Sequence, residues 1–188
     1  MDKRKTIMVD MDDVIVKGGF LYLINNFLGT NYTENDFTDF YMQDSIPNKD
    51  EFFKYFLENN LYDHCEMLPD AYDVLKELNE HYDVFIGTSY IYKEIPNESG
   101  KILLQKYDYL LKHLPFINPY KYIFISNKNI LKFDIKIDDK LDNLEGSDRK
   151  LLFSAYHNLN INDNDLGIQG IERVNDWQDI KDKLLNNK

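Results

Sequence analysis

Short apolar runs alternate with amphipathic segments along this chain. Such runs, bounded by polar residues, are typical of buried strands, and we expect strands at residues 6–9, 84–87, 122–126, 136–137 with their flanks, and 151–156. Apolar side chains recur at helical spacing in between, which predicts helices around residues 71–78, 103–114 and 177–184. This alternation indicates βαβ units, so the sequence predicts an α/β fold with a three-layer, Rossmann-like parallel sheet.

One region breaks the alternation, because no strand is expected between the first strand and the first predicted helix. Aromatic residues at helical spacing, such as Phe52 and Phe56, occur there instead. We therefore expect a small all-helical cap, residues 15–68, inserted after the first strand and covering the strand ends as a lid. Residues 1–14 and 69–188 are expected to form the α/β core.

The composition narrows the classes of protein that this chain can be. Its 188 residues are 43% hydrophobic, which suffices for the core of one ordinary domain. A formal net charge of −11 disfavours nucleic-acid polymers as partners, because their affinity rests on phosphate neutralisation. No apolar stretch approaches the roughly 18 residues of a membrane-spanning helix, and Cys65 is the single cysteine. We expect a cytoplasmic protein without membrane contact; a small anionic substrate and a homodimer stay open.

Three carboxylates follow the first predicted strand within four residues, namely Asp10, Asp12 and Asp13. A buried strand should not end in clustered anions, because each one resists desolvation and repels its neighbours. A cation relieves this conflict, and Mg²⁺ is the natural candidate because it prefers oxygen ligands. Asp10 and Asp12 share one side of the strand, at the edge where open α/β sheets bind ligands. A solvated acidic turn is the alternative interpretation.

Three further polar motifs follow later strands: the pair Thr88 and Ser89, then Lys128, then the pair Asp138 and Asp139. Taken singly, each has a structural explanation, as a helix cap, a surface lysine or a solvated turn. Together with the acids after the first strand, these make four motifs, and each occurs at a predicted strand end. In this combination, and in this order along the chain, they resemble the motifs of the haloacid dehalogenase superfamily of phosphohydrolases.

The resemblance implies phosphoryl transfer through an aspartyl-phosphate. Such a reaction needs a nucleophile, charge neutralisation and an acid for the leaving oxygen. By resemblance, Asp10 is the nucleophile, and Asp12 is the general acid and base. Thr88, Ser89 and Lys128 are expected to bind the phosphoryl group.

The resemblance also implies a Mg²⁺ ion that bridges enzyme and phosphate. Its expected ligands are Asp10, the backbone carbonyl of Asp12, and Asp139, with Asp138 beside them. Asp13 is interpreted as an exposed residue or one just outside the site. His157 follows the fifth predicted strand and is interpreted as an ordinary loop histidine.

Additional features resemble the 5′(3′)-deoxyribonucleotidases over residues 7–185. Among them are Lys128 eleven residues before Asp139 and the run Asn175-Asp176-Trp177 near the end. This narrower resemblance implies a Mg²⁺-dependent phosphatase of nucleoside monophosphates, with deoxyribonucleotides as the favoured class.

In that family, aromatic residues of the cap stack on the base. Phe56 is therefore the expected base-stacking residue, with Phe20, Phe40 and Tyr41 as looser candidates; packing within the cap is the alternative for all four. Lys101 loosely matches a family lysine near the phosphate.

Two other functions compete with this one. A phosphatase of the same superfamily could act on another small phosphoester, such as a sugar phosphate. A non-catalytic phosphoacceptor module could also cluster acids at a strand end with a hydroxyl and a lysine on later strands. Such a module has no long insertion after its first acids and needs no second acid like Asp12, so we expect an enzyme.

Overall fold

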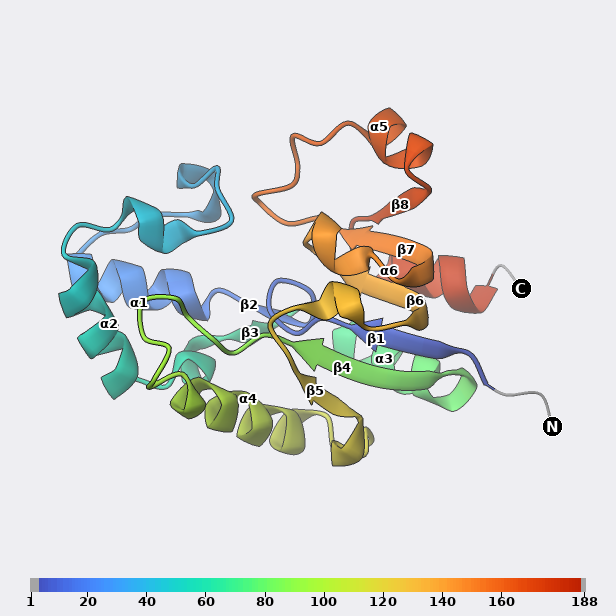
Figure 1. Ribbon diagram of the computed structural model, residues 1–188, viewed down its shortest axis with the longest axis horizontal. Helices are drawn as coiled ribbons and strands as arrows, with labels where there is room; N and C mark the ends of the chain where they lie inside the picture. The colour runs from blue at the N-terminus through green and yellow to red at the C-terminus, as the bar shows by residue number, and fades with distance from the viewer. Residues whose placement is uncertain (1–3, 187–188) are drawn as a thin grey trace.

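A six-stranded parallel sheet forms the centre of the molecule (Figure 1), as described for residues 4–186 by a computed structural model. The strands lie in the order β5-β4-β1-β6-β7-β8, and every neighbouring pair is parallel. Their bounds are β1 Thr6–Val9, β4 Asp83–Thr88, β5 Tyr122–Phe124, β6 Phe133–Asp138, β7 Ser147–Phe153 and β8 Ile171–Val174. The expected α/β class and parallel sheet are confirmed.

Helices cover both faces of this sheet. In the part of the chain that the structure describes, the α-helices are α1 Gly19–Leu28, α2 Lys49–Glu58, α3 Ala71–His81, α4 Gly100–His113, α5 Asp163–Ile168 and α6 Trp177–Lys181. Helices α3 and α6 pack against each other on one face (Figure 1). Leu151 and Phe153 belong to the larger core, whereas Leu152 packs with Leu166 of α5 in a smaller one, as expected when successive strand residues point to opposite faces. Within residues 4–186, no helix has the length and apolar character to cross a membrane.

The sequence does not predict the edge strand β8. Its outer residues Ile171 and Val174 are buried, but Glu172 and Arg173 between them are charged and only half-buried. An edge strand has one neighbour, here β7, so it needs no continuous apolar run. Short strands of this kind give little signal in a single sequence.

The inserted segment, residues 15–68, is not all-helical, which corrects one expectation. It contains α1, α2 and three short 3₁₀ turns, η1 Glu34–Asp36, η2 Met42–Ser45 and η3 Leu61–His64. Its two ends form an antiparallel pair, β2 Val16–Lys17 with β3 Glu66–Met67. Strands of two residues are too short to show an alternating pattern, so the sequence could not reveal them.

The inserted segment extends beyond the carboxyl ends of β1 and β4, where Figure 1 shows α1 and α2. The chain runs from β1 through β4 to the edge strand β5, and then returns to β6 on the other side of β1. Ligands of open α/β sheets bind where the strand order reverses in this way. The reversal therefore places a crevice at the carboxyl end of β1, next to the inserted segment.

Candidate active site

The four polar motifs meet at this crevice, because each follows a neighbouring strand of one parallel sheet. Asp10 follows β1, Thr88 ends β4, and Asp138 ends β6. Lys128 begins the short turn η5, Lys128–Ile130, after β5. A cavity of about 340 Å³ opens here, and Asp10, Ser89 and Lys128 are among the residues that line it.

Asp10 and Lys128 form a buried ion pair at the base of the cavity. The Nζ atom of Lys128 lies 2.6 Å from Oδ2 of Asp10 and 2.8 Å from Oδ2 of Asp138. Burial, together with repulsion from Asp138 and Asp12, raises the pKa of Asp10 to about 6, although Lys128 opposes the shift. Burial disfavours the charged form of Lys128, but attraction by the two carboxylates outweighs it and raises the lysine pKa. The ammonium group therefore stays charged beside the nucleophile candidate.

Asp138 holds Lys128 in place. Its Oδ2 atom accepts the bond from Lys128, while Oδ1 accepts from the backbone N–H of Lys140 at 3.0 Å and from Nδ2 of Asn143 at 2.9 Å. The buried ammonium of Lys136 donates to the backbone carbonyl of Lys128 at 2.9 Å. These contacts fix the turn that carries Lys128.

Asp12 is bonded through both of its carboxylate oxygens. Oδ1 accepts a hydrogen bond of 2.7 Å from the hydroxyl of Tyr62 in η3. Oδ2 contacts the ammonium of Lys106 in α4, which also donates to Oγ1 of Thr88 at 2.6 Å. The lysine that joins the site is thus Lys106, while Lys101 lies exposed on the same helix, which corrects the looser alignment.

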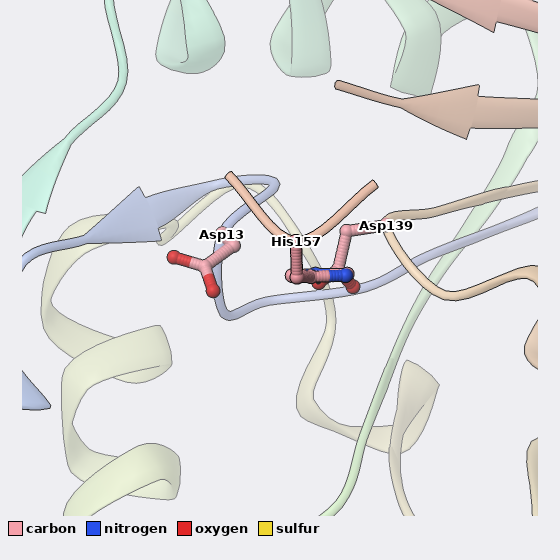
Figure 2. Close-up of side chains that lie close together, drawn as sticks. All are labelled: Asp13, Asp139 and His157. Carbon is pink, nitrogen blue, oxygen red and sulfur yellow. The ribbon is translucent and has the colours of Figure 1, made fainter. Parts of the chain in front are cut away.

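Asp139 is held by His157, which comes from the loop after β7 (Figure 2). Nε2 of the histidine lies 2.7 Å from Oδ2 of Asp139, and the backbone carbonyl of Asp139 accepts from Nδ2 of Asn158 at 2.8 Å. His157 is therefore more than an ordinary loop residue.

Asp13 lies close to Asp139 and His157, with its backbone in the left-handed region at φ 57° (Figure 2). The residue is half-buried and lines the cavity. Burial and repulsion by Asp139, Asp12 and Glu34 raise its pKa. The structure thus places Asp13 at the site, beside Asp139 and His157.

The charges of the site fit a divalent cation. Oxygen atoms from Asp10, Asp138 and Asp139 lie within 4.8 Å of one another, and all three residues are buried. Asp12 and Asp13 bring the number of carboxylates to five, against the two ammonium groups that contact them. Hard oxygen donors with an excess of negative charge match the preferences of Mg²⁺. Because Asp138 is engaged by its three donors, Asp10 and Asp139 are the carboxylates suited to bind the ion.

Phe56 does not line the cavity, contrary to its expected contact with a base. Its side chain is completely buried. The centroid of its ring lies 5.6 Å from that of Phe20 and 5.2 Å from that of Tyr92. Phe20 and Tyr92 do line the cavity, with their rings nearly parallel and 6.0 Å apart. Phe56 is part of the core of the inserted segment and supports the aromatic wall from behind.

The two remaining aromatic candidates, Phe40 and Tyr41, lie at the cavity between the inserted segment and the sheet. The ammonium of Lys140 lies 4.5 Å from the centroid of the Phe40 ring, and that ring meets His157 edge-on at 4.9 Å. The hydroxyl of Tyr156 donates to the backbone carbonyl of Phe40 at 2.9 Å. Residues of the loops that follow β6 and β7 thus hold this part of the segment beside the acids.

The fold of this protein is that of solved hydrolases of the haloacid dehalogenase type. The structure resembles the putative HAD-hydrolase YfnB from Bacillus subtilis, with a TM-score of 0.55 and 14% identity over 98% of this chain and 100% of that chain. It also resembles a putative haloacid dehalogenase-like hydrolase from Burkholderia xenovorans LB400, with a TM-score of 0.55, 10% identity and 98% of each chain covered. At these identities the likeness concerns the fold.

Residues 4–188 match the family described as "5′ nucleotidase, deoxy (Pyrimidine), cytosolic type C protein". A putative 5′(3′)-deoxyribonucleotidase of Staphylococcus aureus (strain Mu50) is 32% identical over 188 residues, covering 98% of this chain and 97% of the relative. The 5′(3′)-deoxyribonucleotidase of Bacillus subtilis (strain 168) is 29% identical, covering 97% and 99%. The chain belongs to this nucleotidase family, which confirms the resemblance and the expectation of a phosphoric monoester hydrolase.

Proposed function

We propose that this protein is a Mg²⁺-dependent phosphatase of nucleoside monophosphates, with deoxyribonucleotides favoured, that acts through an aspartyl-phosphate. The observation that carries the proposal is the buried pair of Asp10 and Lys128, 2.6 Å apart at the base of a cavity with an aromatic wall. A carboxylate next to a charged lysine at a strand end suits nucleophilic attack on a phosphate ester. The cytosolic type in the family description supports the expected cytoplasmic location.

In the first step, a carboxylate oxygen of Asp10 attacks phosphorus and forms a new oxygen–phosphorus bond. The bond between phosphorus and the nucleoside oxygen breaks, and Asp12 gives its proton to that departing oxygen. Lys128 and the hydroxyls of Thr88 and Ser89 stabilise the charge on the phosphoryl oxygens. The products of this step are a free nucleoside and the phosphorylated Asp10.

In the second step, water attacks the phosphorus of the aspartyl-phosphate. Asp12, now a carboxylate, takes a proton from that water, and the bond between phosphorus and Asp10 breaks. Inorganic phosphate leaves, Asp10 is again a carboxylate, and Asp12 again carries the proton. The two steps together consume one water molecule for each phosphate released.

Asp10, Asp139 and the backbone carbonyl of Asp12 would hold the Mg²⁺ ion. When bound, this cation supplies neutralisation of the negative charge shared by the phosphate and the clustered carboxylates. His157 orients Asp139 for this role through its 2.7 Å contact.

The aromatic wall supports a nucleotide over other small phosphoesters. Phe20 and Tyr92 offer flat apolar faces next to the cavity, and these faces suit stacking with a base. A sugar phosphate has no aromatic group that could stack in this way. The names of the relatives support deoxyribonucleotides as the favoured class.

The test is release of inorganic phosphate from a panel of monophosphates by the purified protein, with Mg²⁺ or with EDTA. The panel contains dUMP, dTMP, dGMP, UMP, 3′-dUMP and a sugar phosphate. We expect Mg²⁺-dependent release that is fastest from deoxyribonucleotides, and no release by the variant Asp10→Asn. Release from the sugar phosphate alone would refute the nucleotide assignment, and undiminished turnover by Asp10→Asn would refute Asp10 as nucleophile.

A further inference from the structure

The carboxylate of Asp12 is held by two donors from distant parts of the chain. Tyr62 belongs to the inserted segment and donates to Oδ1 at 2.7 Å. Lys106 belongs to helix α4 of the α/β core and contacts Oδ2. The two donors also meet each other, because the Lys106 ammonium lies 5.8 Å from the centroid of the Tyr62 ring. The side chain of Asp12 is 47% exposed and lines the cavity, whereas the two residues that hold it, Tyr62 and Lys106, are buried.

Tyr62 is rigidly placed. It is 4% exposed, its backbone N–H donates to Oδ1 of Asn60 at 3.1 Å, and its ring packs 5.6 Å from that of Tyr109. The turn η3 that carries it lies directly against helix α1, where a Cβ atom on Gly19 would stand 2.5 Å from the backbone carbonyl oxygen of Leu61.

Lys106 stands between Asp12 and the phosphoryl-binding residues. It is 2% exposed, and its ammonium donates to Thr88 Oγ1 at 2.6 Å while it contacts Asp12. A buried ammonium needs anionic or polar partners in every state of the enzyme. A phosphate dianion that enters at Thr88 offers this ammonium a stronger partner than a single carboxylate does.

We infer that Tyr62 and Lys106 are positioning residues for Asp12. Tyr62 fixes one carboxylate oxygen permanently from the inserted segment. Lys106 holds the other oxygen until a phosphoryl group at Thr88 attracts the ammonium. That oxygen of Asp12 is then free to take a proton from water in the cavity and to give it to the departing nucleoside oxygen. This inference rests on the proposed function, because it concerns the acid and base of that reaction.

The arrangement gives each residue a separate consequence. Because the Tyr62 hydroxyl holds Oδ1 of Asp12, the other carboxylate oxygen of Asp12 is the one directed to the leaving oxygen. Loss of the Tyr62 hydroxyl should therefore harm the step in which Asp12 acts as an acid. Loss of the Lys106 ammonium should weaken the binding of phosphate as well.

The first test is the variant Tyr62→Phe, assayed with a deoxyribonucleotide and with p-nitrophenyl phosphate. kcat/KM reports the steps up to the first product release, which include protonation of the leaving oxygen. An alkoxide needs that proton, whereas p-nitrophenolate leaves without it. We expect kcat/KM to fall by about 10- to 100-fold for the deoxyribonucleotide and to stay nearly unchanged for the aryl phosphate.

Tyr109→Phe is the matched control, because this ring packs on Tyr62 without contacting Asp12. It should keep wild-type kcat/KM for both substrates. An Asp12→Asn background gives a second check, since Tyr62→Phe should add little further loss there if it acts through Asp12. Equal losses on both substrates, no loss at all, or fully additive losses in the Asp12→Asn background would overturn the role of Tyr62.

Lys106→Met tests the other donor through a readout that needs no turnover. Inorganic phosphate should bind this variant at least tenfold more weakly than wild type in calorimetry, and Lys101→Met, on the exposed face of the same helix, should bind as wild type. Unchanged phosphate affinity in Lys106→Met would overturn the exchange of the ammonium. A wild-type protein that releases no phosphate from any substrate would instead refute the proposed function, so the two failures are distinguishable.

Discussion

The ammonium of Lys128 lies 2.6 Å from the Oδ2 atom of Asp10, in a position where both side chains are almost completely buried. Asp138, at the end of the neighbouring strand β6, binds the same ammonium at 2.8 Å. One cation therefore serves two carboxylates, and the remaining negative charge must be balanced from outside the protein chain. This shortage of positive charge explains why the site suits a divalent cation.

Removal of the Lys128 charge should abolish most of the activity. We expect Lys128→Met to lower kcat by about 100- to 1,000-fold, because a fixed charge next to the reacting phosphate is lost. The exposed Lys132, in the same loop, supplies the control Lys132→Met. Steady-state assays of both variants decide the matter; a Lys128→Met enzyme as active as the control would contradict the assigned role.

Asp10 should cost the protein stability at neutral pH when no divalent cation is present. Its pKa of about 6 in the folded protein exceeds the ordinary value of 3.8, so the folded state binds this proton more tightly than the unfolded state. The cost is therefore absent below pH 3.8, grows between pH 3.8 and 6, and is complete above pH 6. Asp10→Asn should raise the free energy of unfolding by on the order of 2 kcal/mol at pH 7.5.

Urea unfolding in EDTA at pH 7.5 and at pH 4.5 measures this effect. The difference between Asp10→Asn and wild type should shrink at the lower pH. A constant difference at both values would show that Asp10 ionisation does not carry it.

His157 should tune metal affinity through Asp139. We expect His157→Ala to weaken Mg²⁺ binding by about 10- to 100-fold, because an oriented carboxylate loses its partner. Calorimetric titration of Mg²⁺ in the absence of substrate gives the dissociation constant. His81→Ala, an exposed histidine on α3, should titrate like wild type, and a His157→Ala protein that did the same would exclude this role.

Phe20 and Phe56 should have opposite phenotypes, although both belong to one aromatic cluster. Phe20→Ala should raise KM for deoxyribonucleotides by about tenfold, the loss of about one stacking contact, with little change for p-nitrophenyl phosphate. Phe56→Ala should instead lower the free energy of unfolding by about 3–5 kcal/mol and affect both substrates equally. A selective KM effect of Phe56→Ala would restore it as the residue that contacts the base.

The sequence predicted the residues that close each central strand, because an apolar run that ends in an acid, hydroxyl or lysine is a strong local signal. Asp10, Thr88, Lys128 and Asp139 all follow such runs, and parallel strands bring their ends together. The order of the motifs then supplied the chemistry. The candidate metal ligands and the candidate nucleophile could be chosen for the same reason.

Lys106 and Tyr62 gave no comparable signal. Lys106 lies inside a helix, where its inward direction depends on how α4 packs, and Tyr62 lies in a short turn far along the chain from Asp12. Phe56 shows the limit from the other side. Helical spacing indicates that aromatic residues share a face, but it does not tell whether that face is turned to a cavity or to a core.

The pairing of β2 with β3 has a consequence for how this protein could diversify. Neighbouring strands lie about 4.8 Å apart, so the two ends of the inserted segment, paired in their own two-stranded sheet, lie side by side. A module attached in this way can be lengthened, shortened or exchanged without disturbing the order of the six central strands. Any replacement would still have to present a hydroxyl to Asp12, as Tyr62 does. This one contact therefore limits which segments could take the place of the present one.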